Sequence, residues 1–99
     1  MVDENSNRLI LGDCREVLRH IGTQSVHAIV TDPPYELGSF RKMIGNWEQT
    51  PVCDSNVFSE CNRILVDGGH LACFSSNRTM YKFGGAIKRD GFEIRDTLI

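Results

Sequence analysis

Residues Val26 to Tyr35, VHAIVTDPPY, decide the fold of this 99-residue chain. The first six, VHAIVT, are almost all apolar or β-branched, which is typical of a strand buried on both faces of a parallel sheet. Pro33 and Pro34 then stop strand pairing, because neither ring nitrogen carries a hydrogen. Each proline also disfavours a helical conformation in the residue before it. The sequence therefore predicts that Asp32 is held extended at the carboxyl end of a strand, where open α/β sheets bind ligands.

The segment before this strand predicts a strand, a helix and a turn. Arg8 to Gly12 (RLILG) is apolar enough for a short strand. Cys14 to Ile21 has apolar residues on one helical face, so we expect a helix there. Asp13 can cap that helix, and Glu16 stands three residues later in the capping-box position. Thr23 to Ser25 then form the turn into the central strand.

The segment after this strand predicts a loop and then alternating helices and strands. We expect a loop over Glu36 to Thr50, a helix over Pro51 to Leu65 and a tight turn at Asp67 to Gly69. A second buried strand should follow over His70 to Ser75, and then a helix over Asn77 to Asp90, which Ser76 or Asn77 caps and Gly91 ends. The last expected element is a strand over Phe92 to Ile99. The order β-α-β-α-β-α-β predicts an α/β fold, a mostly parallel sheet with flanking helices.

Composition indicates a single small domain over residues 1–99. The hydrophobic fraction of 40% and the charged fraction of 24% are those of an ordinary globular chain. No apolar run is long enough to cross a bilayer, and the acidic start MVDENSN is unlike a secretory signal or a transit peptide. We therefore expect a cytoplasmic protein with no membrane partner.

The four cysteines predict a reducing compartment and no metal site. They are Cys14, Cys53, Cys61 and Cys73, which stand far apart and form no C-x-x-C pair. Cys73 lies inside an apolar run, so we expect it to serve as a small hydrophobic residue of the core.

The tetrapeptide Asp32-Pro33-Pro34-Tyr35 resembles the catalytic motif of the amino-group DNA methyltransferases, which transfer a methyl group from S-adenosylmethionine to N6 of adenine or N4 of cytosine. The lead-in LILGDCREVLRHIGTQSVHAIVTDPPY resembles the same family. The run RILVDGGHLACFSSNRTMYKFGGAIKRDGFEIRDTLI resembles its phage and prophage members, and this resemblance implies a role in restriction-modification. The resemblance thus covers about residues 8 to 99. It implies a partial Rossmann-like, S-adenosylmethionine-dependent fold, and Asp rather than Ser at position 32 favours adenine.

The resemblance implies catalytic roles for Asp32, Pro33, Pro34 and Tyr35. The Asp32 carboxylate and the Pro33 carbonyl would accept the two N–H groups of the base amine, held in place by the paired prolines. Acceptors that strengthen as charge develops on nitrogen lower the barrier selectively in the transition state. Tyr35 would stack on a base that has been flipped out of double-stranded DNA.

The resemblance also implies a cofactor site formed by Asp13, Cys14 and Asp32. Asp13 would accept from the adenine amino group of S-adenosylmethionine, and the Cys14 amide would donate to a ring nitrogen. The alternative is that Asp13 is only a helix cap, and the two roles can coexist. Trp47-Glu48 resembles a Trp-acid pair of the phage-type members. It is interpreted as a mobile flap near the flipped base or as a tryptophan that pins the loop to the core, and the second interpretation is preferred.

Several parts of a complete member of this family are not found in the sequence. There is no aromatic-x-Gly-x-Gly cofactor loop and no target-recognition region, and the last predicted strand stops at Ile99. The net charge of −2 also gives no basic surface of the kind that usually grips DNA. We therefore expect an incomplete catalytic domain, the N-terminal part of an enzyme that a C-terminal part or a second chain completes. The alternatives are an inactive truncated remnant, a binding module, or a methyltransferase that acts on RNA or protein.

Overall fold

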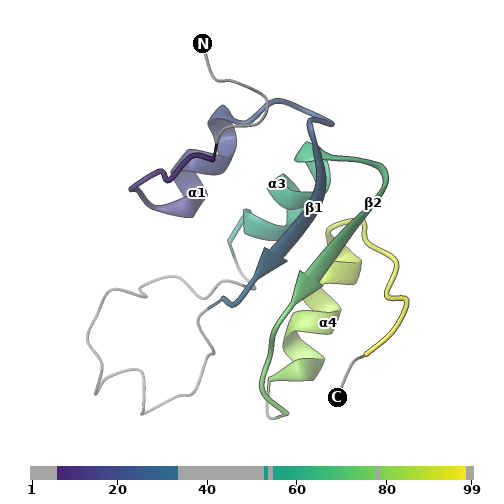
Figure 1. Cartoon of the computed structure of the whole chain (residues 1–99). Helices are drawn as coiled ribbons and strands as arrows, with labels where there is room; N and C mark the ends of the chain where they lie inside the picture. Colours follow the sequence, from purple (N-terminus) through teal and green to yellow (C-terminus); the bar gives the residue numbers. More distant parts are fainter. Residues whose placement is uncertain (1–6, 34–52, 54, 78, 98–99) are drawn as a thin grey trace, which may run out of the picture.

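The computed structural model of the chain describes residues 7–33, 53, 55–77 and 79–97. In chain order, its elements are α1 (Cys14–Val17), the 3-10 helix η1 (Leu18–His20), β1 (Val26–Thr31), α3 (Val57–Ile64), β2 (Leu65–Cys73) and α4 (Met80–Arg89). The strands β1 and β2 lie side by side and run parallel (Figure 1). The chain is therefore a small α/β structure with a two-stranded parallel sheet, compatible with part of a methyltransferase-like fold.

Two of the four predicted strands are absent from the described residues. Residues 8–12 form no strand, and the side chains of Leu9 and Leu11 are fully exposed. Residues 92–97 are also irregular, although Phe92 packs against the core. An apolar segment becomes a strand only when a partner strand takes up its backbone hydrogen bonds. Because β1 and β2 make up the only sheet among the described residues, the predicted order β-α-β-α-β-α-β is wrong there.

The prediction that β1 is buried on both faces is wrong, and β2, predicted as a second buried strand, is also only partly buried. Ile29 of β1 and Leu71 of β2 pack against the core cluster formed with α3 and α4, whereas Val30 is 73% exposed. Both helices lie on one face of the sheet in Figure 1. Because β-strand side chains alternate between the two faces, a sheet covered on one side leaves every second residue open to solvent.

The predicted turn at Asp67 to Gly69 lies within β2, where it interrupts the register of the ladder. Leu65 pairs with Val26, but the next pair joins His70 to Ala28, so the additional residues of β2 bulge between the two pairs. Gly68 supports the bulge with a φ of 82°. A β2 strand over residues 65–73 thus replaces the predicted strand over His70 to Ser75.

Both long helices begin later than the sequence predicts. α3 starts at Val57, whose N–H donates to the Ser55 hydroxyl at 3.3 Å, and it ends at Ile64 because Leu65 is extended and pairs with β1. α4 starts at Met80. The Ser76 hydroxyl accepts from the Thr79 N–H at 3.2 Å, so this predicted cap residue stabilises a turn before the helix.

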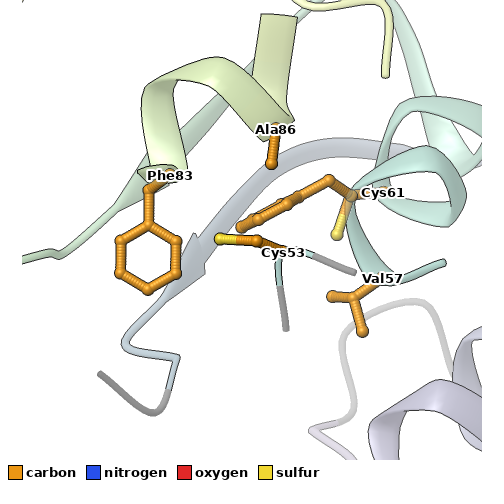
Figure 2. Packing of buried hydrophobic residues seen from close by; sticks show 6 residues of the cluster. Cys53, Val57, Cys61, Phe83 and Ala86 are labelled. Atoms are coloured by element: carbon orange, nitrogen blue, oxygen red, sulfur yellow. The ribbon is translucent and has the colours of Figure 1, made fainter. Parts of the chain in front are cut away.

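The core lies between α3, α4 and the covered face of the sheet (Figure 2). Phe58 is its centre, with 0% of its surface exposed, and its ring meets that of Phe83 edge to face, with centroids 6.3 Å apart and an interplanar angle of 84°. Cys73 is partly buried and packs against this cluster, as expected of a small hydrophobic residue. The cluster consists of Cys53, Val57, Phe58, Cys61, Phe83 and Ala86.

Gly91 terminates α4, as predicted, two positions after the last helical residue, Arg89. The Gly91 N–H donates to the Lys88 carbonyl at 3.1 Å, and the Phe92 N–H donates to the Ile87 carbonyl at 3.2 Å. These two bonds form a Schellman motif, which needs a left-handed residue after the helix. Gly91 supplies it with a φ of 105°.

We expect Gly91→Ala to destabilise the protein by about 1–3 kcal/mol, because a side chain at this φ is strained. A Cβ atom there would also lie 2.5 Å from Asn62 Nδ2. The matched control is Gly85→Ala. Gly85 lies inside α4 with open space around it, so alanine should stabilise the helix by about 1 kcal/mol. Urea unfolding measures both variants, and equal effects of the two substitutions would contradict the assignment of the cap.

None of the helices in the described part of the chain has both the length and the apolar character needed to cross a lipid bilayer.

Candidate functional site

Asp32 lies directly after β1, at the carboxyl end of the parallel ladder. The last ladder pair joins Thr31 to Cys73, and the Thr31 carbonyl accepts from the Phe74 N–H at 3.0 Å. The backbone is therefore held by β2 up to the residue before Asp32. The Asp32 side chain itself is exposed, while Pro33 is buried. The structure thus presents a carboxylate to solvent at the sheet edge where parallel α/β folds bind ligands.

The rest of the predicted catalytic motif, Pro34 and Tyr35, lies outside the described residues. The same holds for the predicted loop over Glu36 to Thr50, including Trp47-Glu48. Their roles stay predictions from the sequence.

Asp13 caps α1, as predicted, but its carboxylate has a strong partner that the sequence analysis did not identify. Oδ1 accepts from the backbone N–H of Arg15 at 2.9 Å. The guanidinium of the same arginine donates through Nε to Oδ1 at 3.0 Å and through Nη2 to Oδ2 at 2.6 Å. These bonds are not those of the predicted capping box. The Asp13 carboxylate accepts from the N–H of Arg15, and the Glu16 carboxylate lies 3.7 Å from Arg19 Nη1.

The hydrogen bonds from Arg15 lower the pKa of Asp13 from 3.8 to about 2. The carboxylate is therefore ionised at neutral pH, which suits an acceptor for an amine. Its acceptor positions are largely filled by Arg15, since a carboxylate offers about four lone-pair sites. An incoming amino group would have to share Asp13 with Arg15 or displace one of its N–H groups.

Replacing Arg15 by alanine should raise the pKa of Asp13 from about 2 toward its ordinary value of 3.8, because the hydrogen bonds that stabilise the charged carboxylate disappear. A depressed pKa stabilises the fold above pH 3.8, and this contribution is lost as the pH falls through about 2. The titration of the Asp13 carboxyl carbon followed by NMR measures the shift. Arg19→Ala, which removes a cation from the next turn, is the control and should leave Asp13 unchanged.

Cys14 is the first residue of α1, and its thiol is exposed and free. Its backbone N–H lies in the first helical turn, where N–H groups have no partner within the helix. The geometry is compatible with the predicted donation to a ligand nitrogen.

The pKa values of two thiols in or beside the core are raised. Burial raises the pKa of Cys73 to about 11, and the charge of Asp32 adds to this shift. Burial likewise raises the pKa of Cys61 to about 11, with smaller contributions from Cys14 and Cys73.

No hydrogen bond or ion pair of the described residues joins the predicted cofactor residues Asp13 and Cys14 to the predicted catalytic residue Asp32. The two parts meet through the core, since Leu18 of η1 and Ile29 of β1 both pack against the same cluster. Across the described ranges, no group of three or more His, Cys, Asp or Glu side chains is placed to hold a metal ion.

Comparison with known proteins relates the chain to the DNA methyltransferases through one distant similarity. No protein-family profile matches the chain, and no solved structure matches it. The DNA adenine methyltransferase YhdJ of Escherichia coli (strain K12) is 33% identical to it over 75 residues, which are 73% of this chain and 26% of that protein. The chain thus spans about a quarter of the length of this curated relative. The similarity supports a relationship between this chain and the DNA methyltransferases.

Proposed function

We propose that this chain is the N-terminal, catalytic part of a DNA methyltransferase that transfers a methyl group from S-adenosylmethionine to a base amino group, N6 of adenine in preference to N4 of cytosine. The observation that carries the proposal is the exposed Asp32 carboxylate at the end of the parallel ladder, followed in sequence by Pro-Pro-Tyr. The 33% identity with a DNA adenine methyltransferase supports it.

Asp32 and Pro33 act on the nucleophile. An exocyclic base amine is a weak nucleophile, because its lone pair is shared with the ring. Two acceptors on its two N–H groups, the Asp32 carboxylate and the Pro33 carbonyl, direct the lone pair toward the methyl group. They also stabilise the positive charge that grows on nitrogen as the bond to carbon forms. The amine loses a proton once the methyl group has moved.

Asp13 and Cys14 contribute to cofactor binding in this proposal. S-adenosylmethionine, when bound, supplies a methyl group activated by a positively charged sulfur. The ionised, exposed Asp13 carboxylate fits its adenine amino group once Arg15 yields one acceptor position. The Arg15 side chain is itself partly exposed, so it has room to move.

DNA binding needs more surface than these residues supply. A net charge of −2 gives little attraction to phosphates, so the proposal assigns the basic surface, the glycine-rich cofactor loop and target recognition to a C-terminal part or a second chain. The double-stranded substrate would present its target base flipped out of the helix.

The 99-residue chain alone should show no measurable binding of S-adenosylmethionine in calorimetry, because half of the cofactor contacts are assigned to other residues. Micromolar binding would contradict this division of the site. Bovine serum albumin at equal concentration controls for nonspecific uptake.

Base-modification mapping of host DNA tests the function itself. We expect N6-methyladenine at a defined target sequence in a host that carries the chain with its surrounding gene, and loss of that mark when codons 1–99 are deleted in frame. N4-methylcytosine instead would correct the base assignment. Unchanged DNA in both strains would contradict the proposal and favour a remnant or a binding module.

A further inference from the structure

Arg63, on the last turn of α3, joins this helix to two residues that lie 40 and 45 positions earlier in the sequence. Its Nη2 donates to the Leu18 carbonyl at 2.8 Å, and its Nη1 donates to the Thr23 hydroxyl at 3.0 Å. Its Nε donates to the Glu60 carboxylate one helical turn earlier. The planar guanidinium spreads five N–H groups over three nitrogens in a fixed fork and so reaches all three acceptors at once, whereas the three N–H groups of a lysine ammonium share one nitrogen.

The first of these contacts leads directly to the predicted cofactor residues. The Leu18 N–H donates back to the Cys14 carbonyl, so the backbone of a single residue, Leu18, connects Cys14 to Arg63. The Leu18 carbonyl also accepts from the Ile21 N–H at 3.1 Å, so Arg63 binds its second lone pair near the end of a short helical segment, where a cation is favourable. Arg63 therefore anchors the turn that begins with Asp13.

The second group of contacts leads to the strand that presents Asp32. Besides holding the Thr23 hydroxyl, Arg63 accepts through its carbonyl from the Gln24 N–H at 2.9 Å. The Ser25 N–H donates to the Ile64 carbonyl at 2.8 Å, and β1 starts at the next residue. This end of α3 thus fixes the start of β1.

We propose that Arg63 is a positioning residue that sets the place of the Asp13–Cys14 cofactor segment relative to the strand that presents Asp32. The expected effect on methyl transfer rests on the proposed function, whereas the placement of α1 by Arg63 does not. No hydrogen bond or ion pair of the described residues joins Asp13 or Cys14 to Asp32. The Arg63 side chain bonds both to Leu18, in the segment that Asp13 caps, and to Thr23, shortly before the strand that presents Asp32. Glu60 orients the guanidinium from within α3. Both side chains are largely shielded from solvent, which strengthens a charge-assisted hydrogen bond.

Amide hydrogen exchange on the full 99-residue chain tests the placement. In Arg63→Lys we expect the Val17 and Ile21 amides, which bond within the α1–η1 segment, to exchange roughly tenfold faster. The Phe74 amide of the ladder and the Phe92 amide of the α4 cap should change less than about twofold. Glu60→Gln should give a smaller effect at the same amides, since Arg63 is kept. Arg89→Lys, an equal change on α4, should leave the α1–η1 segment unchanged.

A uniform loss of protection in Arg63→Lys, including Phe74 and Phe92, would overturn the proposal and make Arg63 a general stabiliser. No change at Val17 and Ile21 would overturn it as well.

The consequence for methyl transfer is measured in the host, with the gene intact. Misplaced cofactor residues weaken cofactor binding, so Arg63→Lys should lower the methylated fraction of target sites, and a raised supply of S-adenosylmethionine should restore it. A deficit that does not respond to the cofactor supply would contradict a role in cofactor placement. If wild-type DNA shows no methylation that depends on the chain, the proposed function fails, and the exchange measurements still decide the role of Arg63 in the fold.

Discussion

Asp32→Ala should lower methyl transfer by about 10²–10³-fold, which corresponds to the loss of one acceptor that acts mainly in the transition state. The carboxylate is exposed and follows the last ladder pair, so its removal leaves the hydrogen bonds of β1 in place. The methylated fraction of host target sites at limiting expression measures the loss. Unlike the Arg63→Lys deficit, this one should persist when S-adenosylmethionine is abundant.

Asp32→Asn is the matched variant, because an amide keeps one acceptor oxygen at the same place but loses the charge. It should retain more activity than the alanine variant. The urea midpoint of both variants should equal that of the wild type, since surface substitutions usually change stability by less than about 0.5 kcal/mol. An alanine variant that keeps more than a tenth of wild-type methylation would show that Asp32 has no catalytic role.

Phe58→Ala should unfold the isolated chain. Phe58 is fully buried at the centre of the core and packs edge to face on Phe83. Truncating a buried phenylalanine to alanine costs about 3–5 kcal/mol. Small domains bury a limited part of their surface, and total stabilities begin at about 5 kcal/mol, so a loss of this size removes most of the stability. Near-ultraviolet circular dichroism and urea unfolding measure the effect.

The control for this substitution is Phe74→Ala. Phe74 follows β2 and is 58% exposed, so alanine should change the free energy of unfolding by less than about 1 kcal/mol. Comparable destabilisation by the two substitutions would show that the core does not lie between α3, α4 and the sheet.

Local signals in the sequence predicted the elements that depend on neighbouring residues. The apolar run over Val26–Thr31 and the two prolines after it identified β1 and its end. Gly91 identified the end of α4, because only a residue that tolerates positive φ completes the Schellman motif. Asp13 identified the start of α1, because an aspartate side chain can accept a first-turn N–H.

Features that depend on distant residues were predicted poorly. The run RLILG has the composition of a strand, but the described chain gives it no partner, and Leu9 and Leu11 stay exposed. The helix predicted from Pro51 to Leu65 ends at Ile64, because pairing with Val26 draws Leu65 into β2. The burial of β1 on both faces was wrong for the same reason, as periodicity does not reveal how many layers cover a sheet.

In the candidate site too, features set by neighbouring residues were easier to predict than features set by distant ones. The position of Asp32 at a strand end followed from Pro33 and Pro34, although its chemical role stays a prediction. The pairing of Arg15 with Asp13 had a local signal in their spacing of two residues, and the sequence analysis missed it. Arg63 gave no signal in one sequence, since Thr23 and Leu18 lie 40 and 45 positions away.

The parallel pairing of Thr31 with Cys73 has a consequence for biosynthesis. At a translation rate of ~5–20 residues per second, β1 leaves the ribosome several seconds before β2 is complete. During that interval its backbone donors and acceptors have only water as a partner. Contacts between such distant segments also slow the spontaneous folding of a released chain. The nascent polypeptide therefore passes through a period in which the VHAIVT segment is open to chaperones and to aggregation, before the ladder that presents Asp32 can form.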